Sequence, residues 1–246
     1  MNGEPFNLQN MKIKVYRDLM GANDQWADKT RRLLAAKNVK MINLIGSPGA
    51  GKTALLEETI KLIAGRLKVG RDSLSRRGRT RLCGPTLLKI AVLEGDIATQ
   101  NDAKRLAKLN CRVSQLLTGG ACHLEAKMVH YALRDLPLGK LDLVIVENVG
   151  NLVCPAEFDI GEHAKAVVLS VTEGEDKPQK YPTIFREAKA IVISKTDLLP
   201  NVPFKLKKCL ALIRRINPRT PIFQISAVTG QGMDEWLDWL TALARA

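Results

Sequence analysis

The sequence predicts a doubly wound α/β domain with a mainly parallel sheet, preceded by a short N-terminal helical extension. Short apolar runs recur along the chain, and helix-compatible stretches such as 54–67 and 102–108 separate them. A glycine-rich loop follows the first apolar run of the domain. Strands that alternate with helices in this way form a parallel sheet covered on both faces.

Seven segments are expected to be strands, because each is a short apolar run that is often rich in β-branched residues. They are MINLIG (41–46), LLKIAVLEG (87–95), the weaker CRVSQLLTG (111–119), LDLVIVE (141–147), AKAVVLSVT (164–172), AKAIVISK (188–195) and PIFQIS (221–226). Residues 1–38 are interpreted as a leader with a helix around 26–36, and residues 39–246 as the domain. A helix over 232–246 is expected to face the core through Met233, Trp236, Leu237 and Leu240, which have helical spacing.

The composition is that of a soluble globular protein, with 46% hydrophobic and 26% charged residues. No apolar run approaches the ~20 residues that span a bilayer, and the N-terminus lacks a secretion signal pattern. We therefore expect a cytoplasmic protein without a membrane span. Five cysteines without a CxxC pair argue against both a disulfide framework and a zinc finger.

The formal charge of +13 raises the question of nucleic-acid binding. Much of the excess lies in residues 66–81, RLKVGRDSLSRRGRTR, which contain no aromatic residue to stack on a base. We interpret 66–85 as a flexible basic insertion, with contact to phosphate, membrane or RNA as the alternatives. Nucleic acid is not expected as the main partner.

A phosphate-binding motif, GSPGAGKT, occupies residues 46–53. Glycines permit close backbone approach, so that successive N–H groups can surround phosphates. Lys52 is expected to act catalytically on the β- and γ-phosphates, and the Thr53 hydroxyl to ligate Mg²⁺. The predicted phosphate-loop contacts are Gly46, Ser47, Pro48, Gly49, Ala50, Gly51, Lys52, Thr53 and Ala54.

The bound base is predicted from the segment SKTD. Asp197 would accept hydrogen bonds from both N1–H and the 2-amino group of guanine, and Lys195 would lie along the base. Ser226 and Ala227 follow a later strand and would contact the guanine oxygen. Ser194 stands where GTPases usually carry asparagine, so we expect a looser loop and weaker affinity. The nucleotide is therefore predicted to be GTP or GDP.

Two acidic residues at strand ends are expected to serve the phosphate chemistry. Glu147 and Gly150 occupy the Walker B and switch II position, with the acid near Mg²⁺ and the glycine near the γ-phosphate. Asp96, in EGDIATQNDAKR, suits switch I, where it would ligate Mg²⁺ or polarise water. Lys52, Asp96 and Glu147 form the predicted catalytic set. Asp102 is expected to begin the next helix.

Cys122, His123 and Cys154 could form a second metal site. Thiolate and imidazole prefer nickel, zinc or copper to magnesium. Three ligands are an incomplete set, which a two-fold dimer could complete. Buried cysteines and a polar histidine without a metal are the alternative at this point.

Four strings strengthen the metal hypothesis: ENVGNLVCPAEFDIGE, TEGEDKPQKYP, EGDIATQNDA and CHLEA. From about residue 20 to 246 the chain resembles the hydrogenase nickel-incorporation GTPases (HypB), SIMIBI-class P-loop proteins. The resemblance implies a GTP-hydrolysing metallochaperone that helps to insert nickel into [NiFe] hydrogenase and couples nucleotide state to metal binding. It implies Ni²⁺, or Zn²⁺, on Cys122, His123 and Cys154.

The resemblance also implies partners. These are a second copy of the chain, joined by GTP or metal, a nickel-delivery accessory protein and the hydrogenase large-subunit precursor. Because no arginine finger can be identified, we expect slow turnover. The leader has no cysteine or histidine, so no tight nickel storage is expected there. The alternatives are a urease-type or other metal-insertion GTPase, and a GTP-regulated nucleic-acid-binding protein.

Overall fold

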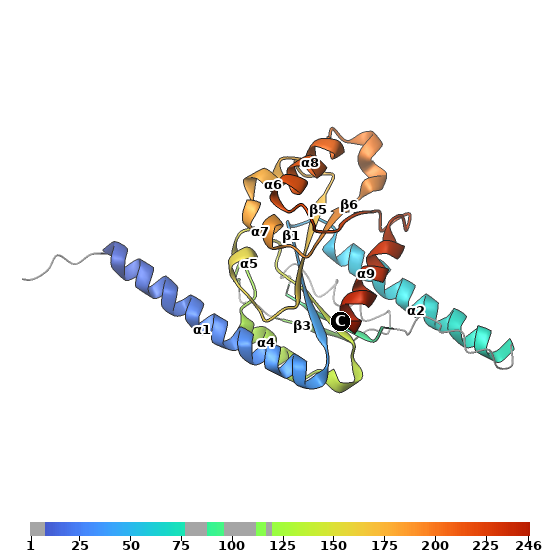
Figure 1. Ribbon diagram of the computed structural model, residues 1–246, viewed down its shortest axis with the longest axis horizontal. Helices are drawn as coiled ribbons and strands as arrows, with labels where there is room; N and C mark the ends of the chain where they lie inside the picture. Colours follow the sequence, from blue (N-terminus) through green and yellow to red (C-terminus); the bar gives the residue numbers. More distant parts are fainter. Residues whose placement is uncertain (1–7, 77–87, 96–111, 117–119) are drawn as a thin grey trace, which may run out of the picture.

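The computed structural model describes residues 8–76, 88–95, 112–116 and 120–246 (Figure 1). Side chains are described from residue 20 onward in the first helix and up to residue 65 in the second. Four sequence predictions lie outside these ranges: Asp96, the switch I segment, the helix over 102–108, and the part of the basic insertion beyond residue 76.

Seven strands form one sheet in which every pairing is parallel, with the order β3-β2-β4-β1-β5-β6-β7 (Figure 1). The predicted fold class and all seven predicted strands are confirmed. The strands are β1 (Lys40–Gly46), β2 (Ile90–Glu94), β3 (Arg112–Gln115), β4 (Leu143–Glu147), β5 (Ala164–Ser170), β6 (Ala190–Ser194) and β7 (Ile222–Ile225).

Helices cover both faces of this sheet. The described α-helices are α1 (Leu8–Lys37), α2 (Lys52–Arg76), α4 (Ala126–Arg134), α5 (Cys154–Glu157), α6 (Lys177–Lys180), α7 (Pro182–Glu187), α8 (Leu206–Ile216) and α9 (Met233–Arg245). Two 3₁₀ turns, η1 (Leu138–Lys140) and η2 (Thr196–Asn201), complete the described helical elements.

Alternate residues of each strand point to opposite faces, which divides the core into two sides. Ile42 and Leu44 of β1 pack with α2 and α9, and the predicted core-facing residues of α9 are all buried there. Met41 and Ile45 pack on the opposite side, where α1 and α4 cover one half and α5, α7 and α8 the other. The central strands β4, β5 and β6 are buried almost throughout and largely apolar because both faces are covered, whereas the edge strand β3 is polar and less buried.

Two helices are longer than the sequence patterns predicted. The leader helix α1 begins at Leu8 rather than near residue 26, and α2 continues to Arg76, beyond the predicted end at 67. Neither stretch contains proline, and isolated glycines weaken a helix without ending it. Residues 66–76 are therefore helical, rather than part of a flexible insertion.

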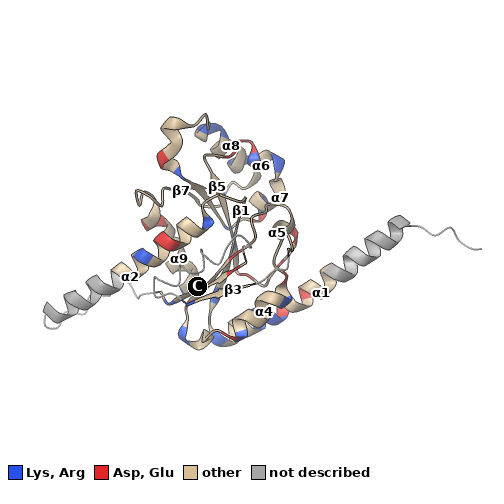
Figure 2. Ribbon diagram, turned by 180° about the vertical axis from the view of Figure 1, so that it is seen from behind, with Lys and Arg blue, Asp and Glu red and all other residues tan. Residues whose placement is uncertain are grey.

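Lys and Arg side chains are distributed over several helices, including α4, α6 and α8 (Figure 2). Among the described residues, no helix is both long and apolar enough to cross a membrane.

The fold places the loops after β1, β4, β6 and β7 at the carboxyl edge of the sheet. The strand order reverses beside β1, because β2, β3 and β4 lie on one side of it and β5, β6 and β7 on the other, and open α/β sheets bind ligands at such a point.

Candidate nucleotide and metal site

The phosphate loop joins β1 to α2, as the motif predicted. Gly49 and Gly51 have φ angles of 70° and 90°, in the left-handed region that favours glycine. Lys52 is buried, and its Nζ donates to the carbonyl oxygens of Gly46 and Ser47 at 3.3 Å each. These two hydrogen bonds place the Lys52 ammonium among the backbone groups that would surround a bound phosphate.

Glu147 connects the end of β4 to the phosphate loop. The hydroxyl of Thr53 donates to Glu147 Oε1 at 2.9 Å, and the glutamate is 1% exposed. A hydroxyl and a carboxylate at this separation are both oxygen ligands of the kind that Mg²⁺ takes beside nucleotide phosphates. The described pair therefore fits a magnesium ion, with Thr53 in the predicted role. Asp96, the third predicted member, lies outside the described residues.

The SKTD loop is packed against the phosphate loop. Lys195 has a left-handed backbone, with φ of 59°, and its Nζ donates to the Gly49 carbonyl at 2.7 Å. The Ser194 hydroxyl donates to the Ala50 carbonyl at 2.6 Å and is buried. Ser194 thus ties the two loops together, which argues against the predicted loosening. Its effect on nucleotide affinity stays a prediction.

The other two base-reading positions lie in short turns. Asp197 is the second residue of the 3₁₀ turn η2, which follows Lys195, and it is half-buried. Ser226 is fully buried, its hydroxyl accepts the Thr229 N–H at 3.1 Å, and its carbonyl accepts the Gly230 N–H at 2.9 Å. These two hydrogen bonds to Ser226 hold the turn that carries Ala227 in place.

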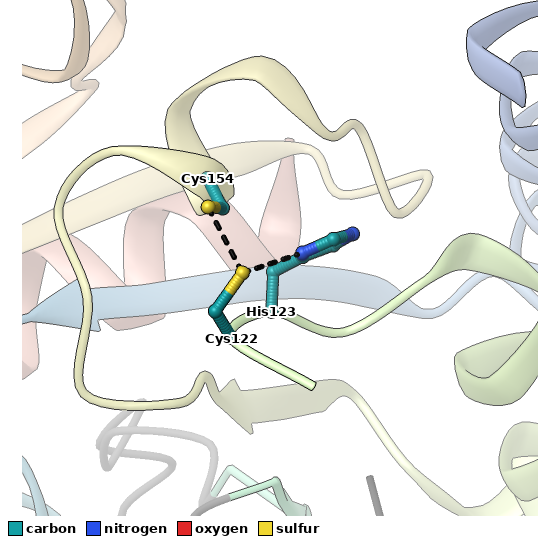
Figure 3. A group of neighbouring side chains, drawn as sticks. All are labelled: Cys122, His123 and Cys154. Atoms are coloured by element: carbon teal, nitrogen blue, oxygen red, sulfur yellow. Dashed lines mark hydrogen bonds between the residues drawn. The ribbon is translucent and has the colours of Figure 1, made fainter. Parts of the chain in front are cut away.

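Cys122, His123 and Cys154 lie together, although they come from two different loops (Figure 3). The two Sγ atoms are 3.0 Å apart, and Cys122 Sγ is 3.4 Å from His123 Nδ1. All three ligand atoms lie within 4.8 Å of one another, and both cysteines are free. Within the described part of the chain this is the one group of three such side chains with metal-binding geometry.

The protonation of these side chains suits a soft divalent ion. Burial lowers the pKa of His123, so the ring is neutral and able to ligate at neutral pH. The hydrogen bond with Cys122, and then burial, raise the pKa of the Cys154 thiol. A bound metal would reverse this effect by replacing the protons.

Asn151 joins the phosphate loop to both metal-ligand segments. Its backbone forms an antiparallel bridge with Gly46 of the phosphate loop. Its side chain donates to the Cys122 carbonyl at 3.2 Å and accepts the Val153 N–H at 2.9 Å, one residue before Cys154. The predicted switch residue Gly150 packs so closely on the phosphate loop that an added Cβ would lie 2.8 Å from the Pro48 ring. Movement of this loop would therefore move Cys122 and Cys154, two of the three predicted metal ligands.

Comparison with known proteins agrees with this geometry. The profile of the CobW/HypB/UreG nucleotide-binding domain family matches residues 79–224. The chain is 44% identical over 236 residues to hydrogenase maturation factor HypB of Escherichia coli K12, an alignment that covers 96% of this chain and 74% of that protein.

The chain belongs to the HypB family.

Two solved HypB structures resemble this HypB-family chain. Hydrogenase maturation factor HypB from Archaeoglobus fulgidus matches with a TM-score of 0.77 and 34% identity, over 91% of this chain and 99% of that one. HypB from Helicobacter pylori in complex with nickel gives the same TM-score and identity, over 91% of this chain and 95% of that one.

Sequence patterns missed three residues that contact parts of this HypB-family site. Asn148 accepts the Leu124 N–H at 3.3 Å, Asn151 holds Cys122 as described, and Lys177 Nζ lies 3.4 Å from the Ser47 hydroxyl. The only sequence signal for these three residues was their position within strings that the sequence analysis had already singled out. Both asparagines lie within the string that contains Glu147 and Cys154, and Lys177 lies in the charged string after β5.

Proposed function

We propose that this chain is a cytoplasmic GTP-hydrolysing metallochaperone that carries nickel as cargo for insertion into [NiFe] hydrogenase. The observation that carries the proposal is the connection through Asn151, which joins the phosphate loop and both metal-ligand segments. Similarity to hydrogenase maturation factors, and to a HypB solved in complex with nickel, supports the choice of cargo and process.

The nucleotide half would bind GTP with Mg²⁺. Lys52 and the glycine-rich loop would hold the phosphates, Thr53 would ligate the ion, and Glu147 would orient Thr53 through the 2.9 Å hydrogen bond. Asp197 would read guanine and Asp96 would act on the ion or the attacking water. Positioning and charge stabilisation account for most phosphoryl-transfer catalysis. Without an arginine finger we expect turnover of roughly 10⁻⁴ to 10⁻² per second.

The metal half would bind Ni²⁺ through Cys122, His123 and Cys154, with Zn²⁺ as a competing ion. Two thiols and an imidazole are soft and intermediate ligands that suit both ions. Hydrolysis of the γ-phosphate would release Gly150 from its position beside Pro48, and Asn151 would transmit that movement to the thiols. Nucleotide state would thereby set the affinity for the metal, as a coupling free energy between two sites.

Three ligands leave coordination positions on the ion for a second molecule. We propose that a second copy of the chain, brought in by GTP or metal, completes the site across a two-fold axis. The nickel-delivery protein and the hydrogenase large-subunit precursor would then exchange the ion with this shared site.

Isothermal titration and single-turnover hydrolysis test the nucleotide half. Lys52→Ala should abolish tight GTP binding, because the only ammonium that the described phosphate loop itself carries is removed. Asp96→Ala should retain binding but lower turnover and its dependence on Mg²⁺. The matched control is Lys61→Ala, which removes an exposed lysine from the same helix. Unchanged GTP affinity in Lys52→Ala would refute the GTPase assignment.

A further inference from the structure

The leader helix α1 contacts the two segments that directly follow the proposed metal ligands in the chain. It lies beside α4, which begins three residues after His123 (Figure 1). It also contacts residues 159–161, which follow the short helix α5 that begins at Cys154. An element outside the predicted nucleotide-binding domain therefore touches each side of the metal site.

Asn23 of α1 makes one hydrogen bond to each of these two segments. Its Nδ2 donates to the Asp159 carbonyl at 2.7 Å, and its Oδ1 accepts the Ala126 N–H at 2.9 Å. The amide is 7% exposed, and rotating it by half a turn would lose both bonds. Asparagine is a weak helix former, so a buried asparagine inside a helix points to a tertiary role.

Two neighbouring contacts hold the same loop against α1. Arg31 forms an ion pair with Asp159. Gly161 has a φ of 84°, and a Cβ at this position would lie 2.7 Å from the Ala27 carbonyl oxygen and from the Thr30 side chain. Only glycine permits so close an approach, and the loop therefore contacts the helix at both Asp159 and Gly161.

The loop that contacts α1 also determines the orientation of the His123 ring. Phe158, which precedes Asp159, stacks on the imidazole with ring centroids 3.8 Å apart. His123 Nε2 is buried and has no hydrogen-bond partner among the described side chains and backbone groups. Metal-bound histidines are usually oriented by a hydrogen bond through the second ring nitrogen. In this chain, packing against Phe158 orients the ring instead.

We propose that Asn23 is a positioning residue of the metal site, which sets the separation between the Cys122–His123 segment and the loop that carries Cys154. This inference rests on the proposed metal-binding function. The helix α1 supplies no ligand, but through Asn23 it holds the two ligand segments at a fixed separation. We call the two hydrogen bonds of Asn23, to the Asp159 carbonyl and from the Ala126 N–H, the brace.

Asn23→Asp tests the brace with the smallest change in shape. The carboxylate can still accept the Ala126 N–H, but it cannot donate to the Asp159 carbonyl. The hydrogen bond between α1 and the Asp159 segment is therefore lost. Asn217→Asp is the matched control. The Asn217 amide also donates to backbone carbonyls, those of Phe185, Arg186 and Ala188, but it joins the end of α8 to the end of α7. Both variants lose an amide donor to backbone carbonyls, from a buried side chain at Asn23 and a half-buried one at Asn217.

Ni²⁺ and Co²⁺ titrations of the full chain, followed by thiolate-to-metal charge-transfer absorption, give the readout. Asn23→Asp should lower metal affinity by about tenfold, the lower end of the range for residues that orient ligands. It should also shift the Co²⁺ spectrum and leave GTP affinity unchanged. Asn217→Asp should match the parent in both affinity and spectrum. Arg31→Met, a milder surface change, should shift metal affinity in the same direction by a smaller factor.

Parent-like metal affinity and spectrum in both Asn23→Asp and Arg31→Met would overturn the brace. Equal losses in Asn23→Asp and Asn217→Asp would also overturn it, because a general loss of stability would then explain both. Failure of the proposed function gives a different result: the parent itself would show no thiolate charge-transfer band, or Cys154→Ala would bind metal as the parent does.

Discussion

The phosphate loop and the metal-ligand cluster are built in opposite ways. Eight consecutive residues, from the last residue of β1 to the second residue of α2, form the phosphate loop, and the hydrogen bonds of Lys52 stay within it. The cluster joins Cys122 to Cys154 across a separation of 32 residues, and it depends on Asn151 and Asn23 for its alignment. The first site is a property of a short sequence, whereas the second is a property of the tertiary structure.

This difference predicts which perturbations each site tolerates. The phosphate loop takes its shape mainly from its own glycines and the helix that follows it, and the side chains of Ser194 and Lys195 support it through its carbonyl oxygens. A site assembled from two loops responds to any movement between them. We therefore expect the phosphate loop to bind the nucleotide with little change in shape. The geometry of the metal-ligand cluster should change with the nucleotide state.

The largest expected effect is on base recognition. Asp197→Asn replaces a double acceptor with an amide that can donate, which should cost GTP up to about 10⁴-fold in affinity and favour xanthosine triphosphate. Competition binding with the two nucleotides measures this change. Asp238→Asn, at an exposed position of α9, is the matched control. If GTP affinity survives and the xanthine nucleotide gains nothing, the base-reading assignment is wrong.

The next effect concerns the ligand set. Cys154→Ala should weaken Ni²⁺ and Zn²⁺ binding by more than the roughly 10- to 100-fold lost when a mere orienting residue is removed. GTP affinity should be nearly unchanged, because the phosphate loop is built locally. Cys209→Ala is the control, since burial raises the pKa of that thiol to about 12 and removes it as a ligand. Equal losses in the two variants would contradict the assignment.

A smaller effect tests the connection between the sites. Asn151→Ala removes the hydrogen bonds to the Cys122 carbonyl and the Val153 N–H, while Gly150 beside it is retained. Each ligand should still bind, but the ratio of metal affinities between nucleotide states should move toward one. Asn201→Ala, at an exposed position, should preserve the parent ratio. A ratio unaffected by Asn151→Ala would show that another contact transmits the change.

The smallest effect concerns the support of the phosphate loop. Trp236 Nε1 donates to the Thr59 hydroxyl at 3.1 Å in the core, which ties α9 to the helix that follows the loop. Trp236→Phe should lower the free energy of unfolding by about 1–2 kcal/mol, because the hydrogen bond is lost. Denaturant unfolding measures this, with half-buried Trp239→Phe as control. If Trp236→Phe destabilised no more than the control, the buried bond would contribute nothing measurable.

The same contrast explains how much the sequence predicted. All seven strands were predicted because a sheet covered on both faces requires short continuous apolar runs. The phosphate loop was predicted because its glycines and Lys52 are neighbours in sequence. Cys122, His123 and Cys154 needed the family resemblance, since spacing alone left a metal-free alternative open.

The positioning residues could not be predicted, because asparagines have no distinctive sequence pattern. Asn23 lies in a helix whose start was predicted after it, and Asn151 lies in a loop whose pairing with Gly46 is tertiary. Ser194 shows the converse. A departure from the usual asparagine predicted a looser loop, yet its hydroxyl finds the Ala50 carbonyl only once the two loops pack together.

The most direct test of the proposed coupling is the Ni²⁺ affinity of the parent protein in its GDP-bound form and in its form bound to a non-hydrolysable GTP analogue. The contacts of Gly150 and Asn151 predict that the two affinities differ by at least about fivefold, the lower end of typical coupling between sites. Sedimentation in parallel would separate this difference from a change in dimerisation. Equal affinities in the two forms would contradict the coupling, even if Cys122, His123 and Cys154 all proved to be ligands.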